Sequence, residues 1–264
     1  MDLIQGGDFM SGNKKVALVT GAGSDHGIGF AIARALSHDH DVVVVTATTE
    51  RIYQRGNELA SPSTQGVGFI CDHTDEIQVL DLFSKIRELG ILATLVNNAG
   101  MVQIGQTEAY LQSHEITLAE WNQSIARNLT TAMLATRSAL QIMRDECYGR
   151  IINIGSTTGF IQTNVGEVAY ASAKAAMVGM TKTVALENAT FGVTCNAIAP
   201  GWIATPSSTE EELRNGRATP IGRSGRPEEI ASLTRYLASK DASFLTGQVI
   251  IVDGGNSLIE GLAR

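Results

Sequence analysis

Short apolar runs alternate with amphipathic segments along most of the chain. The run at residues 41–46 reads DVVVVT, a continuous β-branched stretch of the kind found in strands buried on both faces. Similar apolar runs predict strands at residues 15–20, 66–71 and 150–154, and a further strand that ends near residue 97. The segments between them predict helices at residues 30–37, 50–59, 118–143 and 169–187.

Strands that alternate with helices predict the fold class. They form a doubly wound parallel sheet with helices on both faces, the Rossmann-type α/β architecture, and its ligand crevice lies at the carboxyl ends of the strands. The 264 residues contain no internal repeat or low-complexity block. We therefore expect a flexible tail at residues 1–13 and a single domain at residues 14–264.

Composition narrows the kinds of molecule that the protein is expected to bind. The formal net charge of −7 argues against nucleic acid or an anionic membrane, so a small molecule is expected instead. No apolar run approaches the ~20 residues that a membrane span needs. Cys71, Cys147 and Cys195 lie far apart and show neither a disulfide framework nor metal-ligand spacing. We expect reduced thiols in a cytoplasmic protein, and no metal site.

A glycine-rich turn follows the first predicted strand. Gly27, Ile28 and Gly29 open the helix at residues 30–37, and a glycine turn at a helix N-terminus lets backbone N–H groups approach a pyrophosphate. A tight strand-to-helix turn without a ligand has the same appearance. The turn alone leaves these two interpretations open.

Tyr170 and Lys174 lie four residues apart in a run rich in Ala, Met and Val. In a helix they are neighbours on one face. A fixed ammonium beside a phenol, whose pKa is ordinarily about 10, stabilises the phenolate and makes a usable general acid/base. A solvated Tyr–Lys pair on an exposed helix face has the same spacing, so the pair needs support from the rest of the chain.

Six motifs taken together supply that support. They are Thr20-Gly21 with Gly27 and Gly29, Asn97-Asn98-Ala99-Gly100, Asn128, Ser156, Tyr170 with Lys174, and Pro200-Gly201. In this order and near these spacings they resemble the short-chain dehydrogenase/reductase family from about residue 14 to the end. The resemblance implies an NAD(P)-dependent oxidoreductase that interconverts a secondary alcohol and a ketone on a small, largely uncharged substrate.

The resemblance also implies a catalytic role for four residues. Ser156 would hold the carbonyl or carbinol oxygen, and Tyr170 would move the proton at that oxygen. Lys174 would lower the tyrosine pKa and hold the cofactor ribose, and Asn128 would keep a water in a proton path to solvent. Taken singly, Ser156 reads as a turn serine and Asn128 as a polar helix residue.

A larger set is implied to bind the cofactor. Asp72 would lie near the adenine amino group, although a strand-end Asx turn explains it nearly as well. Ile203 and Thr205 would meet the nicotinamide carboxamide, before a lid at residues 205–220. The implied cofactor-binding residues are Gly21, Ser24, His26, Gly27, Ile28, Gly29, Thr48, Asp72, Asn98, Ala99, Gly100, Tyr170, Lys174, Pro200, Gly201, Ile203 and Thr205.

The choice between NAD and NADP stays open at this stage. The second strand ends in Thr46-Ala47-Thr48-Thr49 and lacks the acidic residue that binds an adenosine 2′-hydroxyl, which favours NADP. Against this, Asp25 and His26 stand in the first loop, and Asp25 would repel a phosphate. Arg51 is the remaining candidate cation.

The substrate residues are predicted from two loops. The segment between Gly100 and Trp121 is longer than in simple ketoacyl reductases, and Ser156 lies fourteen residues before Tyr170. We expect these loops to decide the substrate. The predicted lining residues are Ser156, Val102, Gln103, Phe160, Gln162, Asn164 and Trp202.

Two other functions remain as alternatives. One is reduction of a 3-ketoacyl group on an acyl carrier protein, but the basic residues expected to meet that acidic carrier are replaced by Asp145-Glu146-Cys147 and Phe191. The other is a non-catalytic nucleotide-binding scaffold, which would have no need for the four catalytic residues. The helices at residues 118–143 and 169–187 carry Ala, Met and Thr on faces that a monomer need not cover, and the resemblance implies a homotetramer.

Overall fold

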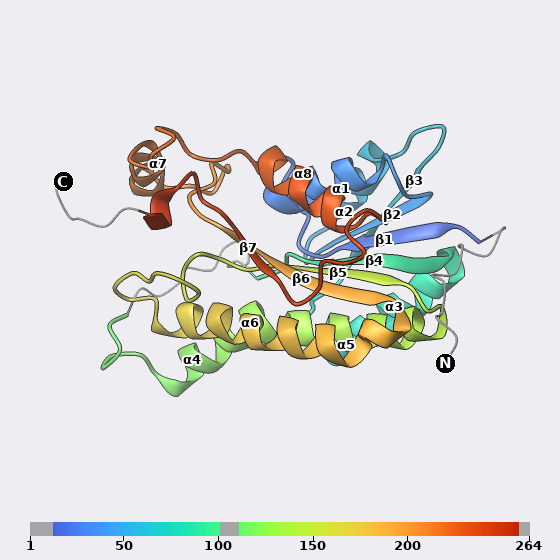
Figure 1. The fold of residues 1–264 in the computed structure, drawn as a ribbon, viewed down its shortest axis with the longest axis horizontal. Coiled ribbons are helices and arrows are strands. Elements are labelled where there is room, and N and C mark those ends of the chain that lie inside the picture. The colour runs from blue at the N-terminus through green and yellow to red at the C-terminus, as the bar shows by residue number, and fades with distance from the viewer. Residues whose placement is uncertain (1–12, 101–110, 259–264) are drawn as a thin grey trace.

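A computed structural model describes residues 13–100 and 111–258. Its seven strands form one parallel sheet in the order β3-β2-β1-β4-β5-β6-β7 (Figure 1). The strands are β1 (Lys15–Val19), β2 (Val42–Ala47), β3 (Gln65–Ile70), β4 (Ile91–Asn97), β5 (Gly149–Ile154), β6 (Val193–Pro200) and β7 (Val249–Val252). The helices are α1 (Ile28–Leu36), α2 (Arg51–Glu58), α3 (Glu76–Leu89), α4 (Leu118–Ile125), α5 (Thr131–Asp145), α6 (Val168–Asn188), α7 (Glu210–Arg217) and α8 (Pro227–Leu237).

Helices cover both faces of the sheet. In Figure 1, α1, α2 and α8 lie above it, and α3, α5 and α6 lie below it. Each face has its own apolar core: Leu18, Leu95 and Ile151 belong to one, and Val19 and Val45 to the other. All five of these side chains are fully buried, which explains the continuous apolar runs of the central strands. The predicted doubly wound parallel sheet is confirmed.

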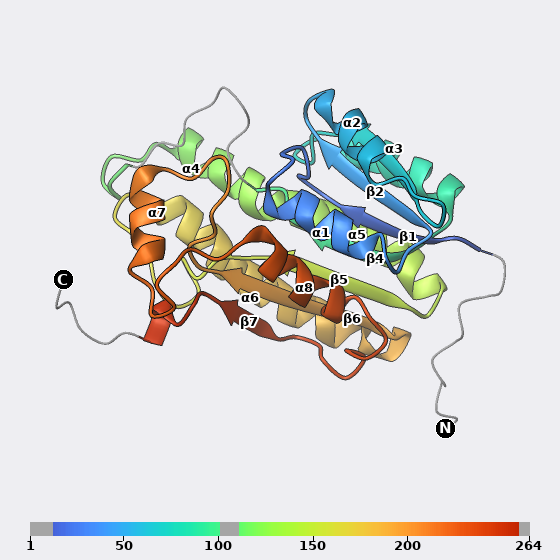
Figure 2. The same ribbon diagram turned by 90° about the horizontal axis from the view of Figure 1, so that it is seen from above.

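The strand order places the ligand crevice. β1 pairs with β2 on one side and with β4 on the other, so the direction of winding reverses between β1 and β4. In such a sheet a crevice opens outside the carboxyl ends of the strands at the reversal. The turns after β1 and β4 therefore meet at this point, and Figure 2 shows β1 between β2 and β4 as seen from above.

The predicted helix at residues 118–143 is interrupted in the structure. A π-helical turn at Ala126–Thr130 separates α4 from α5. Within this stretch the Thr131 hydroxyl donates a hydrogen bond to the Arg127 carbonyl oxygen at 2.8 Å, which competes with regular backbone pairing. The turn brings in an extra residue, and such π-turns often occur at functional sites. Asn128 lies inside this one.

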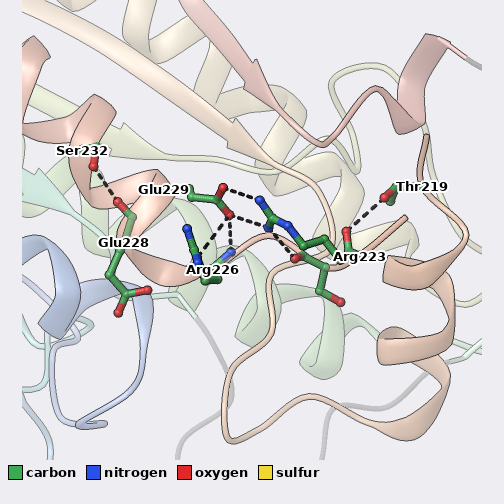
Figure 3. A network of polar contacts seen from close by, with 7 residues as sticks. Thr219, Arg223, Arg226, Glu228, Glu229 and Ser232 are labelled. Carbon is green, nitrogen blue, oxygen red and sulfur yellow. Dashed lines mark hydrogen bonds and ion pairs between the residues drawn. The ribbon is translucent and has the colours of Figure 1, made fainter. Parts of the chain in front are cut away.

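Two further segments, a tail and a lid, are predicted at residues 1–13 and 205–220. The predicted tail at residues 1–13 falls outside the described residues except for its last member. The predicted lid at residues 205–220 contains α7, whose first turn carries the acidic run, with Glu210 and Glu211 exposed. After α7, Arg223 donates two hydrogen bonds to Glu229 at 2.8 and 2.9 Å, and this pair fastens the segment to the start of α8 (Figure 3).

None of the helices within residues 13–100 and 111–258 has the length and the apolar character needed to span a membrane.

Because two histidines are buried, we expect the free energy of unfolding to fall in mild acid. Burial lowers the pKa of His40 and of His73 to about 4, against 6.5 for an ordinary histidine. Below pH 6.5 the unfolded chain takes up protons that the folded chain refuses. Each histidine should therefore lower the free energy of unfolding by about 1.4 kcal/mol for each pH unit between 6.5 and 4.

Urea unfolding at pH 7.5 and pH 5.0 would measure this loss. Glu229 and Asp39 should contribute little between these two pH values, because the carboxyl groups of the unfolded chain take up protons mainly below pH 5, and Arg223 holds the folded pKa of Glu229 lower still, at about 2, while Arg235 lowers that of Asp39. Equal free energies of unfolding at the two pH values would contradict the prediction.

Candidate active site

A cavity of about 830 Å³ opens at the carboxyl ends of the strands. It runs from the turn after β1 to the loops after β5 and β6, and it brings together most of the residues that the sequence singled out. Those that line it are Gly21, Ser24, Gly27, Ile28, Gly29, Thr48, Asp72, Asn98, Ala99, Gly100, Ser156, Gln162, Asn164, Tyr170, Lys174, Pro200, Gly201, Trp202, Ile203 and Thr205.

Of the predicted site residues that the structure describes, three do not line this cavity. Val102 and Gln103 lie outside the described residues. His26 is carried outward by the enlarged first loop, with its side chain 75% exposed and beside Asp25. Phe160 lies in a tight turn closed by its own N–H to the Thr157 carbonyl oxygen, which leaves it out of the lining. Asn128 is buried behind the lining.

The glycine turn after β1 is held against the loop after β4. The Asn98 side-chain amide donates to the carbonyl oxygens of Thr20 and Gly21 at 3.0 and 2.9 Å. A Cβ on Gly21 would lie 2.7 Å from the Ala99 Cα, and a Cβ on Gly29 would lie 2.5 Å from the Asn98 Nδ2. These glycines therefore permit a contact that any larger residue would push apart.

The N-terminus of α1 faces this turn. Its N-cap is Gly27, and no side chain caps it. The first N–H groups of a helix have no partner within the helix, and the helix dipole favours an anion beside them. The turn is thus chemically suited to the pyrophosphate of a dinucleotide.

Tyr170 and Lys174 share one face of α6, as their spacing predicts. The Lys174 ammonium lies 5.6 Å from the centroid of the Tyr170 ring and donates to the Ile154 carbonyl oxygen at 3.1 Å. Lys174 is 6% exposed, so this bond to the end of β5 holds its charge inside the cavity wall. A buried cation close to a phenol favours the phenolate.

Asn128 completes the buried side of this cluster. Its Nδ2 donates to the Ser124 carbonyl oxygen at 3.1 Å, while its Oδ1 is buried and accepts no hydrogen bond from the described residues. A Cβ placed on Gly100 would lie 3.1 Å from this oxygen and 3.5 Å from the Lys174 ammonium. The Gly100 backbone therefore borders both groups, and the arrangement fits the predicted water between them.

Ser156 stands just beyond the end of β5. Its Oγ accepts from the Thr158 N–H at 3.1 Å, which fixes the hydroxyl at the cavity wall. Beneath it, Asn153 is fully buried and ties neighbouring elements together through hydrogen bonds to Asn97 at 2.8 Å and Thr181 at 2.9 Å. This network of β4, β5 and α6 sets the relative position of Ser156 and Tyr170.

The cavity also contains functional candidates that motif reasoning did not select. Glu120 and Arg127 come from the helix around the π-turn, and Glu212 comes from α7. His73 lines the cavity beside Asp72, and its Nε2 is 2.7 Å from the Thr46 hydroxyl. Their positions depend on the path of loops and on the π-turn, for which the sequence carries no local signal.

The sheet carries a glycine turn at its switch point, and a Tyr–Lys pair lies beside the same cavity. Together these features define a dinucleotide-dependent oxidoreductase. Comparison with known proteins agrees. A family model described as enoyl-(acyl carrier protein) reductase matches residues 21–257. The chain belongs to the short-chain dehydrogenase/reductase family. As a member it is an oxidoreductase that uses NAD or NADP.

Relatives match over nearly the whole chain. The 3-oxoacyl-(acyl-carrier-protein) reductase FabG of Vibrio cholerae is 36% identical over 93% of this chain and 98% of its own. That of Aquifex aeolicus is 38% identical over 91% and 96%. Among solved structures, a proposed gluconate dehydrogenase from Agrobacterium tumefaciens superposes with a TM-score of 0.84 at 29% identity, covering 93% of this chain and 97% of its own.

Proposed function

We propose that this protein interconverts a secondary alcohol and a ketone on a small, largely uncharged molecule. The observation that carries the proposal is the placement of Tyr170 and a buried Lys174 in the cavity that the glycine turn also lines. Acid/base chemistry and dinucleotide binding then meet in one space. Ser156 and Asn128 complete the proposed catalytic group.

Each residue has a distinct task in the proposed reaction. The nicotinamide cofactor, when bound, supplies or accepts the hydride. Ser156 donates a hydrogen bond to the substrate oxygen, and Tyr170 gives that oxygen a proton or removes one. Lys174 favours the phenolate form of Tyr170. The Asn128 Oδ1, which accepts no hydrogen bond from the described residues, holds the water that reconnects Lys174 with solvent.

The part of the cavity wall that comes from the loops after β5 and β6 supports an uncharged polar substrate. Gln162 and Asn164 line it from the loop after β5, and Trp202 lines it from the loop after β6. Gln162 is held in place by a hydrogen bond from its Nε2 to the Thr157 hydroxyl at 2.9 Å. Amide groups and an indole offer hydrogen bonds and an apolar surface without a net charge.

Reduction of a 3-ketoacyl group on an acyl carrier protein is a second candidate. The printed names of the relatives favour it. At the end of α5, however, Asp145, Glu146 and Cys147 are exposed, and the Arg144 guanidinium there stacks on the Phe191 ring at 3.9 Å. Exposed carboxylates at this place would slow encounter with an acidic carrier.

A paired substrate assay tests the proposal. Absorbance of the reduced nicotinamide would be followed with a panel of small ketones and alcohols, and in parallel with a 3-ketoacyl group on its carrier protein. We expect turnover of at least one small substrate and a lower kcat/KM for the carrier-bound group. A higher kcat/KM on the carrier would support the second candidate instead, and turnover of neither would favour the non-catalytic scaffold.

Assembly and domain organisation are further parts of the proposal. Leu186 on α6 is 82% exposed and Met133 on α5 is 39% exposed, so the two helices carry apolar side chains that the single chain leaves in solvent. Burying them between copies supports a homotetramer. We also propose that residues 14–264 act as one domain and that residues 205–220 serve as its lid.

A further inference from the structure

Two carboxylates line the same cavity as Tyr170. Glu167 is the N-cap of α6 and stands three residues before Tyr170, and Glu212 lies in the first turn of α7. Both residues are partly buried. Figure 1 shows α7 and the start of α6 at the same end of the molecule. The cavity wall is therefore acidic as well as polar.

Each carboxylate keeps one oxygen without a donor. The Glu167 Oε2 accepts from the Asn164 Nδ2 at 2.9 Å, and the Glu212 Oε2 accepts from the Thr209 N–H at 2.7 Å. Within the residues that the structure describes, neither carboxylate forms an ion pair, and neither Oε1 accepts a hydrogen bond. An ionised carboxylate only accepts hydrogen bonds, so both Oε1 atoms are available to hydroxyl groups of a bound molecule.

The segments that carry these two glutamates bring no cation to the lining. Residues 154–170 and 200–213 are described throughout, and none of their lining residues is Lys or Arg. The cationic lining residues belong to α2, the π-turn and the interior of α6, and they are Arg51, Arg127 and Lys174. A substrate carboxylate or phosphate beside the two glutamates would therefore meet like charge.

Uncharged groups of the same segments suit a molecule with several hydroxyls. Gln162 and Asn164 offer amides, and the Gln162 side chain is fixed by hydrogen bonds to Thr157 at 2.9 Å and from Asn256 at 3.3 Å. Each amide or carboxylate carries two polar atoms on one plane and can contact two neighbouring hydroxyls. Trp202 adds a flat apolar surface on which the C–H groups between those hydroxyls can pack.

We propose that the substrate is an uncharged polyol or monosaccharide whose neighbouring hydroxyl groups bind Glu167 and Glu212, and that these carboxylates exclude sugar acids. The proposal rests on the proposed function, since it takes the hydroxyl that reacts to be the one at Tyr170. Hydrogen bonds to an ionised acceptor are about twice as strong as neutral ones. An alcohol with one hydroxyl would leave both carboxylates unused, and an acid would be repelled by them.

A matched series of alcohols tests this substrate class. D-glucitol, D-gluconate and 1-amino-1-deoxy-D-glucitol share their internal hydroxyl groups and end in a neutral, an anionic and a cationic group. Mannitol and galactitol supply other configurations, and 2-hexanol supplies a single hydroxyl. With NAD and NADP in turn, we expect kcat/KM for the best hexitol to exceed that for its aldonate and for 2-hexanol by about 10-fold or more. Added salt should reduce the preference over the aldonate.

The outcomes separate this inference from the proposed function. A kcat/KM for the aldonate, the amino alcohol or 2-hexanol equal to or above that of every hexitol would overturn the inference and leave alcohol oxidation standing. Oxidation of other alcohols without any hexitol would do the same. Turnover of no alcohol and no ketone would overturn the proposed function as well.

Glutamine variants test the two carboxylates directly. Glu167→Gln and Glu212→Gln keep an oxygen for the Asn164 Nδ2 and the Thr209 N–H, so both segments should hold their shape. Each variant should raise kcat/KM for the aldonate relative to the hexitol by about 10-fold at low salt. Glu210→Gln removes an exposed carboxylate of α7 outside the lining and should leave this ratio unchanged. An unchanged ratio in both lining variants would overturn the role given to these residues.

Discussion

Replacing Tyr170 by phenylalanine should lower turnover by about 10²- to 10⁴-fold, the range that a positioned general acid/base contributes. The substitution removes one hydroxyl and keeps the ring that lies 5.6 Å from the Lys174 ammonium. Lys174 keeps its bond to the Ile154 carbonyl oxygen, so the cavity wall should be preserved. Cofactor affinity, measured by quenching of protein fluorescence, should therefore change little.

Tyr236→Phe is the matched control for this experiment. Tyr236 lies on α8, is 46% exposed and does not line the cavity, so its loss should leave turnover near the wild-type rate. Near-normal turnover of Tyr170→Phe would remove the acid/base role from this residue. A parallel loss of cofactor affinity would show that the hydroxyl acts in binding and not in proton transfer.

Gly68→Ala should be the most destabilising of the single changes considered, at about 3 kcal/mol or more in free energy of unfolding. Gly68 lies on β3, and α2 packs directly onto it. A Cβ there would overlap the carbonyl oxygen of Ile52 and lie 2.7 Å from its carbonyl carbon. Both are backbone atoms, so the helix itself must move to make room.

Urea unfolding would measure the loss, with Ile70→Val as the control on the same strand. Ile70 is 42% exposed, and removing one of its methyl groups should change the free energy of unfolding by less than about 1 kcal/mol. Because α2 also carries Arg51, Gly68→Ala should weaken nucleotide binding at the end of β2. A variant as stable as the control would show that α2 can shift without cost.

Much of the active site could be predicted from the sequence because its signals are local. The spacing of Tyr170 and Lys174 puts them on one helix face, and the glycines at 27 and 29 mark a strand-to-helix turn. Parallel strands bring their carboxyl ends to one edge, so Ser156 after β5 and Asn98 after β4 had to approach the same crevice. Each inference needed no more than a helix period or a strand end.

Other features depend on contacts between distant segments. The π-turn that holds Asn128 packs against α6 together with α4, and no proline or glycine marks it in the sequence. Phe160 and Gln162 look equally suited to line a pocket, yet the hydrogen bonds of their turn direct Gln162 to the cavity and leave Phe160 out. Rotation of a short turn cannot be deduced from residue type.

The two arginines of α2 also show a feature that the sequence left open and the structure decided. From the sequence, Arg51 and Asp25 gave opposite indications about the cofactor. In the structure, Arg55 is the one that approaches Asp25, which leaves Arg51 to face the cavity.

The sequence by itself therefore determined the alternation of strands and helices in a parallel sheet and the Tyr170–Lys174 pair, since these follow from periodicity, whereas the order of the strands came from the structure. The tertiary structure alone decided which charge meets which partner, because ion pairs form between side chains that are neighbours in space and not along the chain.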